Sequence, residues 1–331
     1  MSFVLERKVK GISYYYLEEA FKEWKHWTKE SVYLGNKKPN TALLLKAWDE
    51  LKRKCETRNH LVLIPPLTKY IKGMKARKLE ETRVTKLHFL KKLTPEQRKE
   101  FTQRERIKFI TESNAIEGSS LTYHTTEQII AQEKRLEKKK DYVITGTSRE
   151  EQEAINLNAC LDRYDKYLQS NIPISEKMIL QQHYVLLEKI ENYEKYQGIF
   201  RPVHVYLRGS THEFPAPEYV PSLMKKLLEW HNENENLIHP VELAAKFHTQ
   251  FTSIHPFADG NGRIARLMMN YILQQKTYPF TNIPLKRRNN YMKTQAEANI
   301  GNHKSFTLFL SQEIIKQHLK PSIKTENISN K

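Results

Sequence analysis

Apolar residues recur at every third or fourth position through most of the chain, which is the pattern of amphipathic helices packed on a common core. The clearest examples are residues 42–55, 149–168, 175–187, 241–254 and 264–272. Pro240 suits the first position of one of these helices. Pro256 ends the same helix, because the residue before a proline is pushed out of the helical region. The pattern predicts a mainly α protein.

Two regions depart from this helical pattern. Residues 1–41 contain β-prone runs with Gly11 as the turn of a hairpin, although residues 18–28 fit a helix equally well. Residues 201–207 are also β-prone, and the glycine, serine and prolines that follow favour a turn and then an end to the strand. We therefore expect a small β region at the N-terminus and a β-hairpin over residues 201–217.

Charge and cysteine content narrow the partners and the compartment. The 331 residues include 55 basic and 38 acidic side chains, for a net charge of +17, which favours acidic partners. Cys55 and Cys160 are far apart in sequence, so we expect no disulfide framework and a reducing compartment such as the cytoplasm. The chain has neither the apolar core of a signal peptide nor the ~18 consecutive apolar residues of a membrane helix. We expect no membrane partner.

The segment between the two central helices carries the strongest chemical signal. Gly260 and Gly262 enclose Asn261 in a chain that has only ten glycines, a pattern typical of a backbone nest whose N–H groups point at an anion. Arg263 and Arg266 then occupy the first turns of a helix, where its dipole disfavours cations. Their presence is explained if an anion with several phosphates binds there. We predict a phosphate site.

Three further side chains fit this chemistry. His255 stands at a helix end beside the nest and can accept a proton near neutral pH. Asp259 offers the oxygen ligand that Mg²⁺ prefers. Glu117 ends a predicted helix over residues 104–117, where the dipole disfavours an anion, so we expect it to have a cationic partner elsewhere in the fold. The set is typical of phosphoryl-group transfer.

Residues 255–266, HPFADGNGRIAR, resemble the Fic-family motif HPFxDGNGRxxR at every fixed position. The resemblance implies a helical core with a β-hairpin flap and the activity of a protein adenylyltransferase, which transfers AMP from ATP to a hydroxyl of a target protein. It also implies the roles of the motif residues. His255 would be the base, Asp259 the Mg²⁺ ligand, Gly260, Asn261 and Gly262 the anion hole, and Arg263 and Arg266 the ligands of the β- and γ-phosphates.

Two looser resemblances extend the site. Ser113 and Glu117 match the family's inhibitory motif (S/T)xxxE(G/N), which implies that Glu117 pairs with Arg266 and blocks the γ-phosphate. The alternative is a glutamate exposed to solvent. Tyr291 and Asn299 follow the motif at positions that border the adenine in the family, although core packing of Tyr291 is an open alternative.

The resemblance also suggests a division of the chain. We expect a small basic N-terminal module at residues 1–41, a helical connecting region at 42–100, the catalytic domain at 101–315 with the inhibitory helix, and a disordered tail at 316–331. The target would dock on the flap at 201–217, for which an ordinary surface hairpin is the alternative. The N-terminal module is open between a structural extension, which its composition favours, and a nucleic-acid or partner-binding region.

Other functions stay open at this point. The enzyme could transfer another nucleotide or remove AMP, and the chain could form a homodimer. A nucleic-acid-binding regulator would use the basic surface, but would require neither His255 nor Asp259. A metal cluster of His239, His248 and His255 does not have the spacing of a metal-ligand motif.

Overall fold

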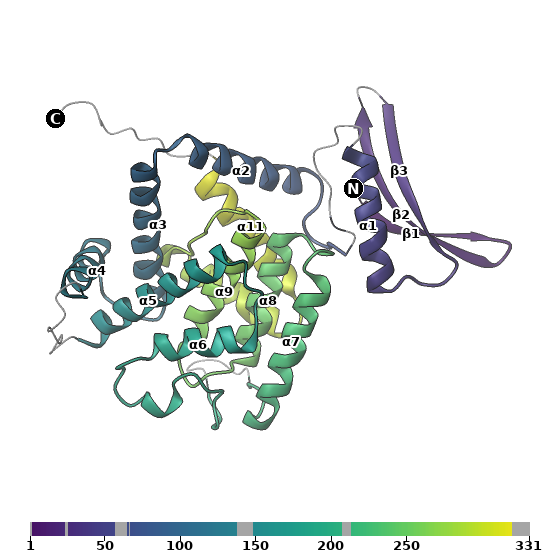
Figure 1. Ribbon diagram of the computed structural model, residues 1–331. Helices are drawn as coiled ribbons and strands as arrows, with labels where there is room; N and C mark the ends of the chain where they lie inside the picture. Colours follow the sequence, from purple (N-terminus) through teal and green to yellow (C-terminus); the bar gives the residue numbers. More distant parts are fainter. Residues whose placement is uncertain are drawn as a thin grey trace.

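The computed structural model describes residues 2–23, 26–56, 65, 67–137, 148–206 and 213–319. Within these ranges it contains eleven α-helices and one three-stranded antiparallel sheet (Figure 1). The sheet and its covering helix lie at one end of the molecule, and the other helices form the main body. The prediction of a mainly α fold with N-terminal strands is confirmed.

The sheet consists of β1 (Ser2–Val9), β2 (Ile12–Glu23) and β3 (His26–Gly35) in that order. Gly11, with φ +81°, forms the predicted turn between β1 and β2. Of the ambiguous residues 18–28, those that the structure describes, 18–23 and 26–28, are strand and not helix. The reason lies in the register, because Leu17 pairs with Val32 and both side chains are buried on the same face.

Helix α1 (Thr41–Glu56) covers this face and shares a small core with the sheet. The core includes Leu17, Val32 and Leu51, and it also takes in Leu237 from the main body. Leu67 strengthens this connection, because its N–H donates to the carbonyl of Leu237 over 2.9 Å. The division of the chain at residue 41 stays a prediction.

Ten further helices build the main body. They are α2 (Gly73–Lys92), α3 (Pro95–Ile116), α4 (Tyr123–Glu137), α5 (Arg149–Gln169), α6 (Glu176–Leu186), α7 (Val220–Asn234), α8 (Pro240–Ile254), α9 (Asn261–Gln275), α10 (Arg288–Asn299) and α11 (His303–His318). Helices α8 and α9 pack on each other at the centre (Figure 1), and nearly every side chain of α9 is buried. The segment between them is therefore held by the core on both sides.

Helix α3 carries two site residues to the centre of the molecule. It begins with a capping box, in which Thr94 accepts from the N–H of Gln97 and the Gln97 side chain accepts in return from the N–H of Thr94. It ends at Ile116, followed by Glu117 as the C-terminal cap and by Gly118 with φ +112°. Its last turn contacts α9.

The predicted hairpin over 201–217 is corrected. The described residues 201–206 and 213–216 contain no strand, and Gly209 and Ser210 lie outside the described residues. The N–H of Arg201 donates to the carbonyl of Pro256 over 2.9 Å instead of to a partner strand. The prolines at 202 and 215 have no N–H to donate to a strand ladder.

The predicted start of the disordered tail is also corrected. Helix α11 continues through residue 316 to His318, which is only 6% exposed, because this last turn still packs on the body. Residues 320–331 lie outside the described residues. Among the described helices, none combines the length and the apolar character that a bilayer crossing requires.

Glu242 joins α8 to the start of α2 and gives a test of the fold. Its buried carboxylate accepts hydrogen bonds from the N–H groups of Lys69, Tyr70 and Ile71 at 2.8–3.4 Å. Glu242→Ala should lower the free energy of unfolding by about 2–4 kcal/mol, because it leaves these N–H groups unsatisfied. Urea unfolding measures this. Glu229→Ala, at a side chain 57% exposed, is the control and should change it by less than ~0.5 kcal/mol. Equal effects of the two substitutions on the free energy of unfolding would contradict the stabilising role assigned to Glu242.

Candidate active site

The loop between α8 and α9 has a fixed and unusual backbone. His255 ends α8 in the left-handed region with φ +51°, and Gly260 precedes α9 with φ +78°. The Asn261 side chain closes the loop, because its oxygen accepts from the N–H of Phe257 at 2.9 Å and its amide donates to the Phe257 carbonyl at 2.8 Å. Gly260 provides no side chain to cap the first N–H groups of α9. These groups are therefore available to an anion.

His183 of α6 supports the backbone of this loop, and its only signal in the sequence is a histidine on an apolar helix face. Its Nε2–H donates to the carbonyl of Asp259 at 3.1 Å, and its Nδ1 accepts from the N–H of Gly198 at 3.1 Å. The ring stacks on Phe257 with centroids 3.6 Å apart. Burial lowers its pKa to about 4, so the ring is neutral and both nitrogens are satisfied. A Cβ at Gly260 would overlap the neighbouring Leu186.

The imidazole of His255 lies in the same neutral state. Its Nδ1 is 3.4 Å from the carbonyl of Thr252, which can only accept, so Nδ1 carries the proton. The ring stacks on Phe214 with centroids 4.1 Å apart. Burial, with a smaller contribution from the charge of Arg201, lowers its pKa to about 4. Nε2 therefore keeps a free lone pair at neutral pH, as a general base requires.

Arg201 fixes the backbone beneath His255. Its side chain is 2% exposed and donates to three carbonyls: Nε to His255 at 2.7 Å, Nη1 to Val203 at 2.9 Å, and Nη2 to Pro215. The two ends of the segment between residues 203 and 215 are thereby joined to the catalytic loop. Sequence analysis missed this role because backbone carbonyls, unlike charged side chains, leave no pattern in a sequence.

Arg266 is the most extensively bound side chain at the start of α9. It is 2% exposed, and its Nη2 donates to the carboxylate of Glu117 at 2.7 Å and to the carbonyl of Ser113 at 2.9 Å. Its Nε donates to the hydroxyl of Ser113 at 3.0 Å. The predicted pairing of Glu117 with Arg266 is confirmed. The expected cationic partner of this helix-end carboxylate is thus an arginine 149 residues further along the chain.

The carboxylate of Glu117 also lies directly against the nest. A Cβ added at Gly262 would overlap its Oε1 atom, so the missing side chain of this glycine makes room for the carboxylate. An anion at the N-terminus of α9 is stabilised by the helix dipole. In this structure, a side chain of the protein occupies the position in which we expected a phosphate.

Asp259 and Arg263 belong to a closed network of four charges. Arg263 is 2% exposed, with Nη2 3.3 Å from Asp259 and Nη1 3.2 Å from Glu153. Arg149 completes the ring, because its Nη2 is 3.4 Å from Asp259 and its Nε donates to Glu153 at 3.0 Å. The sequence did not identify the two α5 residues. Arg263 faces carboxylates in this arrangement, and its contact with phosphate stays a prediction.

The two residues expected near adenine lie on α10. Tyr291 is 1% exposed and packs against Phe306, and its hydroxyl contacts Arg266 at 3.2 Å and His248 at 3.0 Å. This placement corresponds to the core-packing alternative, with the added function of orienting Arg266. Asn299 accepts from the hydroxyl of Ser253 at 2.6 Å, which joins α10 to α8. Its contact with adenine stays a prediction.

The histidines of the alternative metal cluster have other partners. His239 accepts from the N–H of Val241 at 3.2 Å and lies 3.1 Å from the hydroxyl of Tyr278, and His248 contacts Tyr291. Within the described residues, no group of three or more His, Cys, Asp or Glu side chains is arranged to hold a metal. Asp259 is a single carboxylate with 28% of its side chain exposed. It fits Mg²⁺ only in the common arrangement of one carboxylate with phosphates and water.

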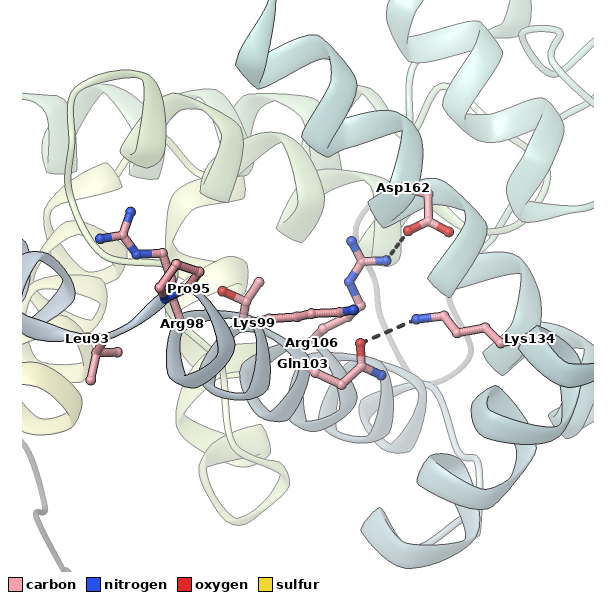
Figure 2. Close-up of a pocket in the computed structure, with 9 residues that line it drawn as sticks. Leu93, Pro95, Arg98, Lys99, Gln103, Arg106, Lys134 and Asp162 are labelled. Atoms are coloured by element: carbon pink, nitrogen blue, oxygen red, sulfur yellow. Dashed lines mark hydrogen bonds and ion pairs between the residues drawn. The ribbon is translucent and has the colours of Figure 1, made fainter.

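A separate cavity of about 550 Å³ lies between α3, α4 and α5 (Figure 2). It is lined by charged and polar side chains, including Arg106, which bridges to Asp162, and Lys134, which donates to Gln103 at 3.3 Å. No residue of the 255–266 loop lines it. We therefore place the site at the loop and not at this cavity.

Comparison with known proteins agrees with this placement. Residues 173–273, which contain the whole loop, match the model of the Fic/DOC family. The protein adenylyltransferase Fic of Drosophila yakuba is 34% identical over 204 residues, and that of Drosophila melanogaster is 33% identical over the same length. Each alignment covers 61% of this chain and 39% of the relative. The chain thus spans about two fifths of the length of these relatives.

Solved structures show the same fold. A Fic-domain-containing signaling protein from Bacteroides thetaiotaomicron superposes with a TM-score of 0.62 at 25% identity, covering 72% of this chain and 94% of that chain. Fic-1 from C. elegans gives a TM-score of 0.60 at 23% identity, covering 84% of this chain and 74% of that chain. Residues 173–273 thus match the Fic/DOC family, the chain shares the fold of these Fic proteins, and the loop at 255–266 lies within the matched region.

The protonation state and the tautomer of His255 can be measured directly. With ¹⁵N-labelled imidazoles, NMR should find Nδ1 protonated and Nε2 bare, with no protonation until the pH approaches 4. Because the folded-state pKa lies below the ordinary 6.5, acidification from pH 6.5 to 4 should also lower stability. Phe214→Ala, which opens the ring to water, should raise this pKa toward 6.5. Titration near 6.5 in the unaltered protein, or a proton on Nε2, would contradict the proposed geometry.

Proposed function

We propose that this protein transfers AMP from ATP to a hydroxyl of a target protein. The observation that carries the proposal is the neutral imidazole of His255, with its free Nε2, next to the uncapped N-terminus of α9. The relatives named protein adenylyltransferase Fic support the reaction class. The single decisive experiment is incubation of the full chain with labelled ATP and detection of label on protein.

The reaction assigns one task to each part of the loop. The N–H groups at Asn261 and Gly262 bind the phosphate oxygens, that of Gly260 joins them once it is released from Asp259 Oδ1, and Arg266 holds the γ-phosphate. The Nε2 of His255 takes the proton of the target hydroxyl as its oxygen attacks the α-phosphorus. The bond between the α-phosphorus and the bridging oxygen breaks, and pyrophosphate leaves. Arg263 binds the β-phosphate once its carboxylate partners, Asp259 and Glu153, have moved away from its guanidinium.

Mg²⁺ is the metal we assign to Asp259. When bound, it would neutralise phosphate charge and orient the α-phosphate. The protein's own contribution is the position of the carboxylate, whose Oδ1 already accepts from the N–H of Gly260 at 2.6 Å. Arg149 and Arg263 face the same carboxylate, so Mg²⁺ would share Asp259 with these two cations. Asn299 remains our candidate for a contact with adenine.

Regulation follows from the same contacts. Glu117 binds the guanidinium that the γ-phosphate requires, so the unaltered protein should have low activity. Ser113 assists by holding Arg266 in place through its hydroxyl and its carbonyl. The segment from 201 to 217, whose two sides are joined by Arg201, is the proposed docking place for the target.

The nucleotide, the direction of the reaction, the compartment and the oligomeric state stay as proposals. Transfer of another nucleotide and removal of AMP are the alternative reactions of the same site. The cytoplasm is the proposed compartment, supported by two buried cysteines, Cys55 and Cys160, that are not joined in a disulfide. A homodimer stays a prediction, and no step of the reaction requires it.

Removing the inhibitory carboxylate should activate the enzyme. Glu117→Gly should raise AMP incorporation at least ~10-fold, which corresponds to about 1.4 kcal/mol of recovered phosphate binding. The assay uses each labelled nucleoside triphosphate with and without lysate, followed by mass spectrometry of labelled bands. Glu100→Gly, at an exposed carboxylate of the same helix that pairs with Arg104, is the control.

Two results would contradict this assignment. Unchanged labelling by Glu117→Gly would show that the carboxylate does not inhibit. Labelling that persists after His255→Ala is added to Glu117→Gly would show that the imidazole is not the base.

The carboxylate of Asp259 should control the metal response. In the Glu117→Gly background, Asp259→Ala should lower labelling at least ~100-fold and abolish its dependence on Mg²⁺, because the phosphates lose their oriented counter-charge. Glu153→Gln, in the same charge network, should retain the Mg²⁺ response. The measurement is the labelling rate against Mg²⁺ concentration. An unchanged Mg²⁺ curve for Asp259→Ala would exclude it as a ligand.

A further inference from the structure

The N-terminal sheet has one face with no structural partner among the described residues. Helix α1 covers the face that carries Leu17 and Val32. The opposite face carries Tyr14 and Tyr16 on β2 and Tyr33 on β3, together with Arg7 on β1. We name these four residues the tyrosine face. It lies on the side of the sheet away from α1, at the end of the molecule remote from the Fic loop (Figure 1).

The register brings these four side chains into one continuous surface. Arg7 pairs with Tyr14 across β1 and β2, and Tyr16 pairs with Tyr33 across β2 and β3. The ring of Tyr33 lies 5.2 Å from that of Tyr16 and 6.5 Å from that of Tyr14. The guanidinium of Arg7 lies 4.9 Å from the Tyr16 ring. The result is a row of three aromatic rings with a cation at its edge.

Folding does not explain the exposure of this surface. Tyr33 is 54% exposed, whereas its neighbours Val32 and Leu34, on the other face, are 6% and 4% exposed. A strand needs apolar side chains only on its buried face, so the exposed ring of Tyr33, with the half-buried rings of Tyr14 and Tyr16 beside it, is an added feature. Aromatic rings on an open sheet are typical surfaces on which nucleic-acid bases stack.

The two ends of the sheet differ in their charged side chains. The β1–β2 turn and the end of β3 lie together, since Val9 pairs with Ile12 and Tyr15 pairs with Gly35. This end holds the tyrosine face and three lysines in the turn and after β3, which are Lys10, Lys37 and Lys38, whereas Lys8 pairs with Ser13 on the face that α1 covers. The other end holds the Glu19–Glu30 pair. The buried Glu18 between the two ends is balanced by Arg7 at 2.9 Å and Lys29 at 3.7 Å.

We propose that the tyrosine face binds single-stranded nucleic acid. Bases would stack on the tyrosine rings, and the surrounding lysines would contact the phosphates. A single strand fits better than a duplex, because the faces of paired bases are hidden within the stack, whereas unpaired bases expose them. The net charge of +17 would assist the encounter. This activity is independent of AMP transfer.

Fluorescence anisotropy of the full-length protein with a labelled oligothymidine of about 12 nucleotides tests the proposal. Tyr33→Ala should weaken binding about 10-fold, the loss of roughly one stacked base. Tyr33→Phe, which keeps the ring, should bind within about 2-fold of the unaltered protein. Tyr219→Ala, at a tyrosine 60% exposed outside the sheet, should have no effect.

A charge-reversal pair separates this surface from general attraction to a basic protein. Lys10→Glu, at an exposed position of the β1–β2 turn beside the tyrosine face, should weaken binding several-fold and reduce its dependence on salt. Lys46→Glu, an identical change at an exposed position of α1 on the other side of the sheet, should have little effect.

Three results would overturn the proposal. They are no binding at low salt, equal effects of Lys10→Glu and Lys46→Glu, and equal binding of a duplex that Tyr33→Ala does not weaken. The first would leave the tyrosine face to a partner other than nucleic acid, and the others would indicate unspecific electrostatic attraction. Far-ultraviolet circular dichroism confirms that each variant is folded, and each substituted side chain is exposed.

Discussion

The uncapped N-terminus of α9 is the constraint on which the site depends. Its first N–H groups and its dipole require an anion, and two arginines in the same turns increase that requirement. Glu117 provides the anion for Arg266, while Asp259 and Glu153 balance Arg263. The site is therefore electrostatically complete without a nucleotide. A triphosphate has to replace a carboxylate that the protein itself provides, which is the physical basis of the proposed low activity.

A rigid and neutral scaffold positions this charged centre. His183 and Asn261 hold the loop by hydrogen bonds to its backbone, and Arg201 holds the backbone of His255 from below. Burial keeps both histidines uncharged, so each has one defined donor and one defined acceptor. Because the scaffold already fixes Nε2 of His255, proton transfer would need no rearrangement of the loop. The N-terminal sheet is attached separately through Leu237, and its open face is available for a different partner.

The sequence allowed prediction of those features that depend on local pattern. The loop at 255–266 has its own turn, cap and charge signals, and the last turn of α3 predicted a distant cation for Glu117. Residues 18–28 were ambiguous, because their local pattern fits either a strand or a helix. The pairing of β2 with β3, for example of Leu17 with Val32, decides between them, and this is a contact between separate segments. The prediction of a hairpin at 201–217 was wrong for the described residues. β propensity is a local property, and it does not account for the hydrogen bonds by which Arg201 holds this segment through backbone carbonyls. His183, Glu153 and Arg149 act through tertiary contacts that no spacing encodes.

The central claim is that the N-terminus of α9 holds a triphosphate once Glu117 is removed. The most direct measurement is a crystal structure of Glu117→Gly soaked with Mg²⁺ and a non-hydrolysable ATP analogue. The account predicts phosphates against Gly260–Gly262, with the γ-phosphate on Arg266 and the α-phosphorus accessible to a hydroxyl beside Nε2 of His255. A nucleotide bound elsewhere, with the loop empty and Arg266 still held by Ser113 and Tyr291 alone, would contradict it.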